Sequence, residues 1–267
     1  MPTSTFNGQE IVYDIVGSGP PLIFIHPLPF DRHIWLYQQA GFSEHFTVIS
    51  MDLRGWGAST KPTHPFLLED IGRDVMGILN DEDLNGDAVI IGCSIGSKIA
   101  LMLACDHPET FRAAVLIGGN CGPQNQFSHR IAGYKEHQEK GILRSYHYDH
   151  LRYGVTQQWA DSTLGRYLLT GFADRGCELD AFSIERVFEA ISVSDLTPKL
   201  VDYLTPTLII NGEFDNALPA GKKTSELIKN SEHFIIPRTG HCCFIEDPNS
   251  FDSRVLEFLN SIGTLGS

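Results

Sequence analysis

The stretch that decides the fold runs from Asp87 to Ala104 and reads DAVIIGCSIGSKIALMLA. Its first part is a short apolar run rich in β-branched residues, which is typical of a strand buried in a parallel sheet. Its last part has apolar residues at helical spacing. Between them lies Gly-x-Ser-x-Gly, centred on Ser94, so the chain turns from strand to helix within five residues. Such a cramped turn needs its flanking glycines, and it presents the Ser94 hydroxyl at a helix N-terminus.

Composition limits the class of protein. The 267 residues are 42% hydrophobic and 20% charged, which suits one large α/β domain with an insertion. The net charge of −13 argues against nucleic acid and anionic membranes as partners. The start of the chain does not resemble a signal peptide, and no apolar run approaches the ~20 residues that span a bilayer. We therefore expect a cytoplasmic protein with reduced cysteines and no zinc site, and leave its oligomeric state open.

Strand and helix signals alternate along most of the chain. Strand signals occur at 22–25, 46–51, 88–91, 111–117, 206–210 and 233–236. This alternation predicts an α/β fold, a mainly parallel sheet with helices on both faces. Strand signals are missing from 122–203, where we expect a helical cap of about four helices. The predicted core therefore comprises residues 1–121 and 204–267, with the cap inserted between them.

Two further polar residues follow later strands. Asp215 comes after one predicted strand and His241 after the next. Because the carboxyl ends of parallel strands meet at one edge of a sheet, Ser94, Asp215 and His241 should lie close together. Serine needs a base to take its proton, histidine can accept and return a proton, and a carboxylate fixes the histidine tautomer. The order Ser, Asp, His therefore predicts a catalytic triad. Glu213 competes for the acid role, but it is closer to the strand end and should point elsewhere.

The chain resembles the α/β-hydrolase superfamily from about residue 10 to 262. The matching pieces are His26–Pro29, Asp52–Ser59, Gly92–Gly96, Gly212–Asp215 with Pro219, and Gly240–His241 with Glu246–Pro248. The resemblance implies an α/β-hydrolase fold, a scaffold role for the 52–59 loop, and no metal or organic cofactor. Two departures stand out: Pro27 replaces the usual glycine of the His-Gly turn, and Cys93 stands where histidine often precedes the nucleophile.

The resemblance also suggests where an oxyanion hole would lie. A tetrahedral intermediate needs preorganised backbone donors, one of which in this fold is the N–H of the residue after the nucleophile, Ile95. The other comes from the turn after the strand that ends at His26. Because Pro27 and Pro29 have no N–H, we expect Leu28 to be this donor.

Candidate substrate contacts are His26 and the aromatic residues of the predicted cap. The aromatic candidates are Tyr146, Tyr148, Trp159, Phe172 and Phe182. They predict an apolar pocket roof, with packing of the cap helices on one another as the alternative.

The favoured function is a serine hydrolase that acts on a small-molecule ester or lactone. The alternatives are a ligand receptor that keeps the triad, and a relative with other chemistry: a C–C hydrolase, a lyase, a cofactor-free oxygenase or a perhydrolase. Turnover of a chromogenic ester would separate a hydrolase from a receptor, while oxygen uptake or cyanide release would reveal the oxygenase or the lyase.

Overall fold

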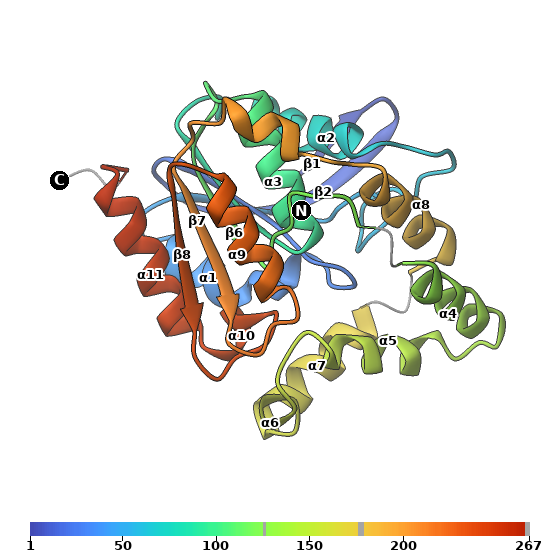
Figure 1. Ribbon diagram of the computed structural model, residues 1–267. Coiled ribbons are helices and arrows are strands. Elements are labelled where there is room, and N and C mark those ends of the chain that lie inside the picture. Colours follow the sequence, from blue (N-terminus) through green and yellow to red (C-terminus); the bar gives the residue numbers. More distant parts are fainter. Residues whose placement is uncertain (125–126, 176–178, 265–267) are drawn as a thin grey trace.

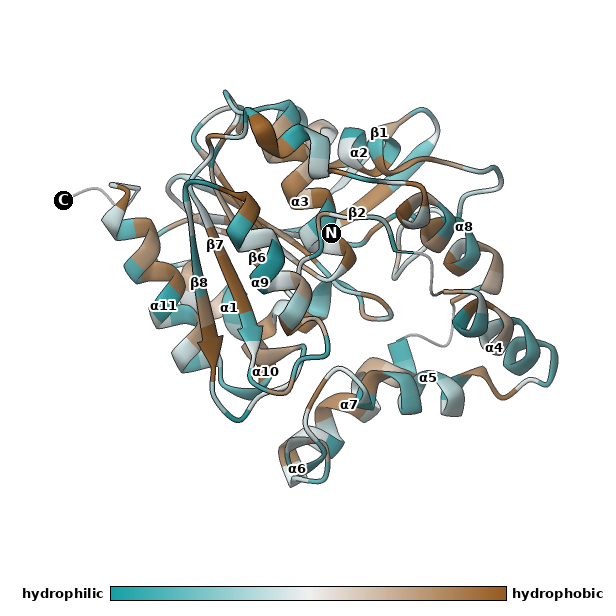
Figure 2. Ribbon diagram, in the orientation of Figure 1, coloured by the Kyte–Doolittle hydropathy of each residue, from teal (hydrophilic) through white to brown (hydrophobic). Residues whose placement is uncertain are grey.

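One twisted sheet organises the molecule. The computed structural model describes residues 1–124, 127–175 and 179–264. Eight strands are hydrogen-bonded in the order β1-β2-β4-β3-β5-β6-β7-β8 (Figure 1). β2 pairs antiparallel with both β1 and β4, and the other pairings are parallel. The strands are β1 (Thr3–Phe6), β2 (Gln9–Gly17), β3 (Pro21–Ile25), β4 (Thr47–Met51), β5 (Ala88–Cys93), β6 (Phe111–Ile117), β7 (Thr207–Gly212) and β8 (Ser231–Ile236). Figure 2 shows hydrophobic residues concentrated in the central strands.

Helices cover both faces of the sheet. One face packs against η1 (Arg32–Trp35), α1 (Leu36–Phe42), α10 (Cys243–Glu246) and α11 (Pro248–Ser261), and the other against α2 (Leu68–Asp81), α3 (Ile95–Asp106) and α9 (Leu218–Leu227) (Figure 1). Successive residues of β5 alternate between the two sides: Val89 and Ile91 belong to the apolar cluster with α11, and Ile90 to the cluster with α3. Because both faces are buried there, the central strands β3 and β5 are buried along their whole length and almost entirely apolar. The α/β-hydrolase fold that the sequence predicts is therefore confirmed.

The chain between β6 and β7 is helical. It contains α4 (Ser128–Glu139), α5 (Leu143–Arg152), α6 (Gln157–Ala160), α7 (Thr163–Arg175), α8 (Ala181–Ser192) and η3 (Thr197–Val201). The described residues thus form five α-helices here, one more than the approximate number expected. We call α4 to α8 the helical insertion. Figure 1 shows α5 and α7 toward the end of the sheet at which β7 and β8 finish.

The 52–59 loop after β4 is a structural support. The buried Asp52 carboxylate accepts hydrogen bonds from the backbone N–H and the guanidinium of Arg32 and from the backbone N–H of Ala58. Arg54 donates two hydrogen bonds of 2.7 Å to the carboxylate of Asp74 on α2. These charge-assisted bonds fix the loop between η1 and α2.

No helix within the described part of the chain combines the length and the apolar character needed to cross a lipid bilayer.

Candidate active site

Ser94 lies in a strained turn between β5 and α3. Its backbone has φ 57° and ψ −114°, a conformation that non-glycine residues rarely adopt. A side chain on Gly92 would collide with the backbone of Gly96, and one on Gly96 would collide with the carbonyl of Ile25. Both glycines are therefore required for the chain to turn this tightly, and Ser94 is held at the start of α3.

Asp215 and His241 form a hydrogen-bonded pair beyond β7 and β8. His241 Nδ1 lies 2.8 Å from Asp215 Oδ1. Asp215 is 4% exposed, and its carboxylate also accepts hydrogen bonds from Asn211 Nδ2 at 2.7 Å and from the Ala217 N–H at 2.8 Å. Since an ionised carboxylate only accepts, His241 donates through Nδ1–H, which leaves Nε2 free to act as a base.

The electrostatics of this pair favour the protonated imidazole. Burial disfavours charge on His241, but the neighbouring Asp215 carboxylate outweighs it and raises the pKa of His241 to about 9. Burial likewise opposes ionisation of Asp215, but the charge and hydrogen bond of His241 hold the pKa of Asp215 below its usual value. The site therefore stabilises the positive charge that develops when His241 takes a proton.

Glu213, the other carboxylate considered for the acid role, faces elsewhere. Its side chain is exposed, and its Oε2 accepts a hydrogen bond of 2.8 Å from the Arg238 N–H. Asp215 is the carboxylate that contacts His241.

The expected oxyanion donors, Leu28 and Ile95, lie in adjoining segments. Gly96, next to Ile95, packs against the carbonyls of Ile25 and His26, so the start of α3 abuts the end of β3. Among the residues that the structure describes, neither the Leu28 nor the Ile95 N–H donates to a backbone carbonyl. Leu28 and Ile95 therefore remain the expected oxyanion donors.

The expectation that His26 contacts substrate is wrong. The side chain is fully buried, Nε2 accepts a hydrogen bond from the Leu53 N–H at 3.0 Å, and Nδ1 lies 3.0 Å from the Pro27 carbonyl. The imidazole therefore uses both nitrogens to join the turn after β3 to the loop after β4. Burial lowers its pKa, which keeps it neutral.

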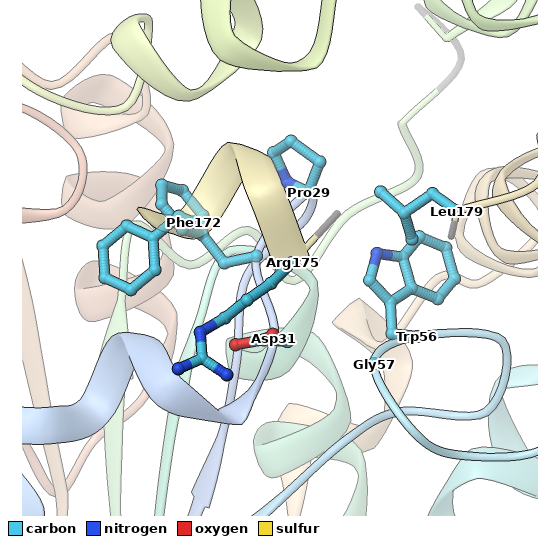
Figure 3. Close-up of a pocket in the computed structure, with 8 residues that line it drawn as sticks. Pro29, Asp31, Trp56, Gly57, Phe172, Arg175 and Leu179 are labelled. Atoms are coloured by element: carbon cyan, nitrogen blue, oxygen red, sulfur yellow. The ribbon is translucent and has the colours of Figure 1, made fainter. Parts of the chain in front are cut away.

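Two small pockets share Pro29 and Trp56 as lining residues. The first, with about 190 Å³ of empty space, also includes Phe172 and Arg175. In Figure 3, the guanidinium of Arg175 lies near Asp31, and Trp56 faces Leu179. The second pocket has about 250 Å³ of empty space; it is lined by Leu28, Pro29, Trp56, Arg130, Tyr134, His150, Ile184 and Phe188. Because Leu28 belongs to it, the second pocket adjoins the expected oxyanion hole.

Of the aromatic candidates, Phe172 lines the first pocket. The others, Tyr146, Tyr148, Trp159 and Phe182, line neither of these two pockets. Tyr146 stacks on His137 at 4.0 Å between ring centroids. Tyr148 and Trp159 pack against an apolar cluster, and Phe182 lies under the guanidinium of Arg186. Tyr146, Tyr148 and Trp159 thus pack against neighbouring side chains, as in the alternative interpretation, whereas Phe182 is exposed.

Sequence reasoning did not single out Trp56, Arg130 or Tyr134 as pocket residues. Trp56 follows the end of β4, and the other two come from α4. Trp56 lies just after a strand end, and this position was the one feature of the sequence that could have indicated a site residue.

In the described ranges, no three His, Cys, Asp or Glu side chains are grouped in a way that could hold a metal ion.

The parallel sheet, with Ser94 on a strained strand-to-helix turn and an Asp–His pair beyond later strands, defines a hydrolase-like α/β protein. The model of the alpha/beta hydrolase fold family matches residues 20–248, and the chain belongs to this family.

Named relatives have several activities. The chain is 25% identical to the non-heme chloroperoxidase CPO-A1 of Kitasatospora aureofaciens, over 96% of this chain and 98% of that protein. It is 24% identical to 3-oxoadipate enol-lactonase 2 of Acinetobacter baylyi, over 94% of each chain. Among solved structures, the enol-lactonase of Burkholderia xenovorans superposes with a TM-score of 0.86 at 24% identity, covering 97% of this chain and all of that one. The last likeness concerns the fold alone.

Proposed function

We propose that this protein is a serine hydrolase that cleaves a small ester or lactone through an acyl-enzyme on Ser94. The observation that carries the proposal is the hydrogen-bonded Asp215–His241 pair at the edge of the sheet where the strained turn presents Ser94. Ser94, His241 and Asp215 then act as nucleophile, base and orienting acid.

Each proposed step uses a group described above. His241 Nε2 takes the proton of the Ser94 hydroxyl as its oxygen attacks the carbonyl carbon of the substrate. The carbonyl oxygen becomes negatively charged and accepts hydrogen bonds from the N–H groups of Leu28 and Ile95. His241 then protonates the departing alkoxide, and the acyl group stays on Ser94. A water molecule releases it by the same steps in reverse, with Asp215 holding the Nδ1–H throughout.

Small pockets and enol-lactonase relatives support a small substrate. Both pockets are lined by only eight residues each, and large apolar side chains such as Trp56 occupy part of each lining. A relative named an enol-lactonase matches nearly the whole chain. A chloroperoxidase relative makes peroxide-dependent chemistry the alternative to exclude.

A substrate panel tests this function. We expect kcat/KM to be highest for esters and lactones with short acyl groups and to fall as the acyl chain outgrows the pockets. The panel is graded 4-nitrophenyl esters and lactones of increasing ring size, with Ser94→Ala protein as the background. The proposal would be contradicted if the enzyme turned over no ester or lactone but showed Ser94-dependent peracid formation, oxygen uptake or cyanide release.

Leu28→Pro should lower kcat by about 10²–10³-fold, because proline removes the N–H that we assign to the oxyanion hole. Leu28→Ala keeps the N–H and should change kcat little. Steady-state kinetics on one ester measures both, with circular dichroism and melting temperature showing that both variants fold. A folded Leu28→Pro enzyme with normal kcat would place the donor elsewhere.

A further inference from the structure

Arg130 lies in the first turn of α4. It lines the second pocket. Among the residues that the structure describes, no Asp or Glu forms an ion pair with it. On the neighbouring helix α5, by contrast, Arg144 pairs with Asp174 and Arg152 with Asp161. The Arg130 side chain is exposed and lines the pocket, so its guanidinium is accessible to a ligand.

Two buried donors line the same pocket. Tyr134 is 2% exposed and Trp56 is 1% exposed, and neither the Tyr134 hydroxyl nor the Trp56 Nε1–H has a hydrogen-bond partner among the described residues. A buried polar group without a partner is costly, so such groups call for a ligand or a water molecule. His150 also lines the pocket, and burial lowers its pKa, which keeps it neutral.

The polar groups that line this pocket suit a negatively charged ligand. It contains one guanidinium and two uncharged donors, and no Asp or Glu is among its lining residues. A guanidinium matches the planar geometry of a carboxylate, and hydrogen bonds to an ionised acceptor are stronger than neutral ones.

We propose that the second pocket binds a free carboxylate on the substrate, so that the enzyme prefers anionic esters or lactones. Arg130 forms the ion pair, and the Tyr134 hydroxyl and Trp56 Nε1–H donate to the carboxylate oxygens. This inference rests on the proposed hydrolase function. Because Leu28 lines the same pocket, the carboxylate and the reacting carbonyl lie only a short chain apart, as in the half-ester of a small dicarboxylic acid.

The charge of Arg130 also acts on the proposed base. Burial lowers the pKa of His241, and the Asp215 carboxylate raises it. The positive charge of Arg130 lowers it further. A bound carboxylate would neutralise part of this effect, so the anionic substrate would itself favour proton transfer to His241.

The test compares matched substrates. 4-Nitrophenyl half-esters of succinic, glutaric and adipic acid are paired with neutral 4-nitrophenyl alkanoates of the same carbon number, each corrected for uncatalysed hydrolysis. Wild-type enzyme should prefer the half-ester at one of these lengths. Arg130→Gln should lower kcat/KM for that half-ester by about 10- to 100-fold, mainly through KM, and change the neutral ester less than about twofold. Arg130→Lys, which keeps the charge, should restore part of the loss.

Arg166→Gln is the matched control, because Arg166 is an exposed arginine of α7 that lines neither pocket. This substitution should leave kcat/KM unchanged for both the half-ester and the neutral ester. Equal loss on half-ester and neutral ester in Arg130→Gln, or loss on neither, would overturn the carboxylate site while leaving the hydrolase function intact.

Binding without turnover separates this inference from the proposed function. Ser94→Ala protein should bind glutarate or adipate in calorimetry, and the added Arg130→Gln change should weaken that binding by about 10- to 100-fold. If neither dicarboxylate binds, or if Arg130→Gln leaves the affinity unchanged, the carboxylate site is wrong. Failure of the wild-type enzyme to hydrolyse any ester, with this binding intact, would instead refute the hydrolase function alone.

Discussion

Ser94→Ala is expected to lower kcat for ester hydrolysis by about 10⁶-fold, the loss seen when the nucleophile of another triad enzyme is removed. No other described group occupies the strained turn, so no acyl-enzyme can form there. The fold should persist, because the Ser94 N–H still donates to the Ile117 carbonyl and the glycines that permit the turn remain. Long-incubation assays on one ester measure the residual kcat, and the melting temperature shows whether the variant is folded.

Ser192→Ala, on α8, is the control for the loss of a serine hydroxyl away from the turn; Ser192 bonds the Glu189 carbonyl within its own helix. It should match wild type. Activity of well-folded Ser94→Ala within about tenfold of wild type would remove Ser94 from the mechanism.

Asp215→Asn should lower kcat by about 10⁴-fold, because an amide favours the wrong tautomer of His241. It should also move the acid limb of the pH profile. In the wild type, the carboxylate raises the pKa of His241, so activity falls as the pH drops through this raised value and His241 becomes protonated. Without the negative charge the pKa falls, and the limb of kcat/KM moves to lower pH.

Glu213→Gln is the matched control, a carboxylate two residues away that bonds the Arg238 N–H instead. Its rate and pH profile should resemble those of the wild type. The reverse result would be a large loss of kcat in Glu213→Gln and a small loss in Asp215→Asn. It would mean that the wrong carboxylate has been assigned.

Local patterns predict most of the sheet and the Ser94 turn. The central strands are buried on both faces, so their apolar runs are visible in the sequence. The turn at Ser94 needs Gly92 and Gly96 for steric reasons that are equally local. β1 was not predicted: Thr3–Phe6 is a four-residue edge strand with an exposed start, and its pairing with β2 provides the hydrogen bonds.

The pockets depend on contacts that no local pattern records. His26 follows a strand end, as a site residue would, yet its ring bonds Leu53 of a different loop. Trp56 and Arg130 come from segments far apart in the sequence, and only the folded chain brings them to one pocket. Aromatic content likewise does not distinguish Phe172, which lines a pocket, from Tyr146, which stacks on its helical neighbours.

Covalent labelling identifies the nucleophile of this protein. The protein is treated with a serine-directed fluorophosphonate, and intact-mass and peptide mass spectrometry locate the adduct. We expect one adduct per chain, on the hydroxyl of Ser94, with loss of esterase activity in step with labelling and no adduct in Ser94→Ala. Stoichiometric labelling of Ser94→Ala, or an inhibited wild-type enzyme whose adduct lies on another residue, would contradict the assignment of Ser94 as the nucleophile.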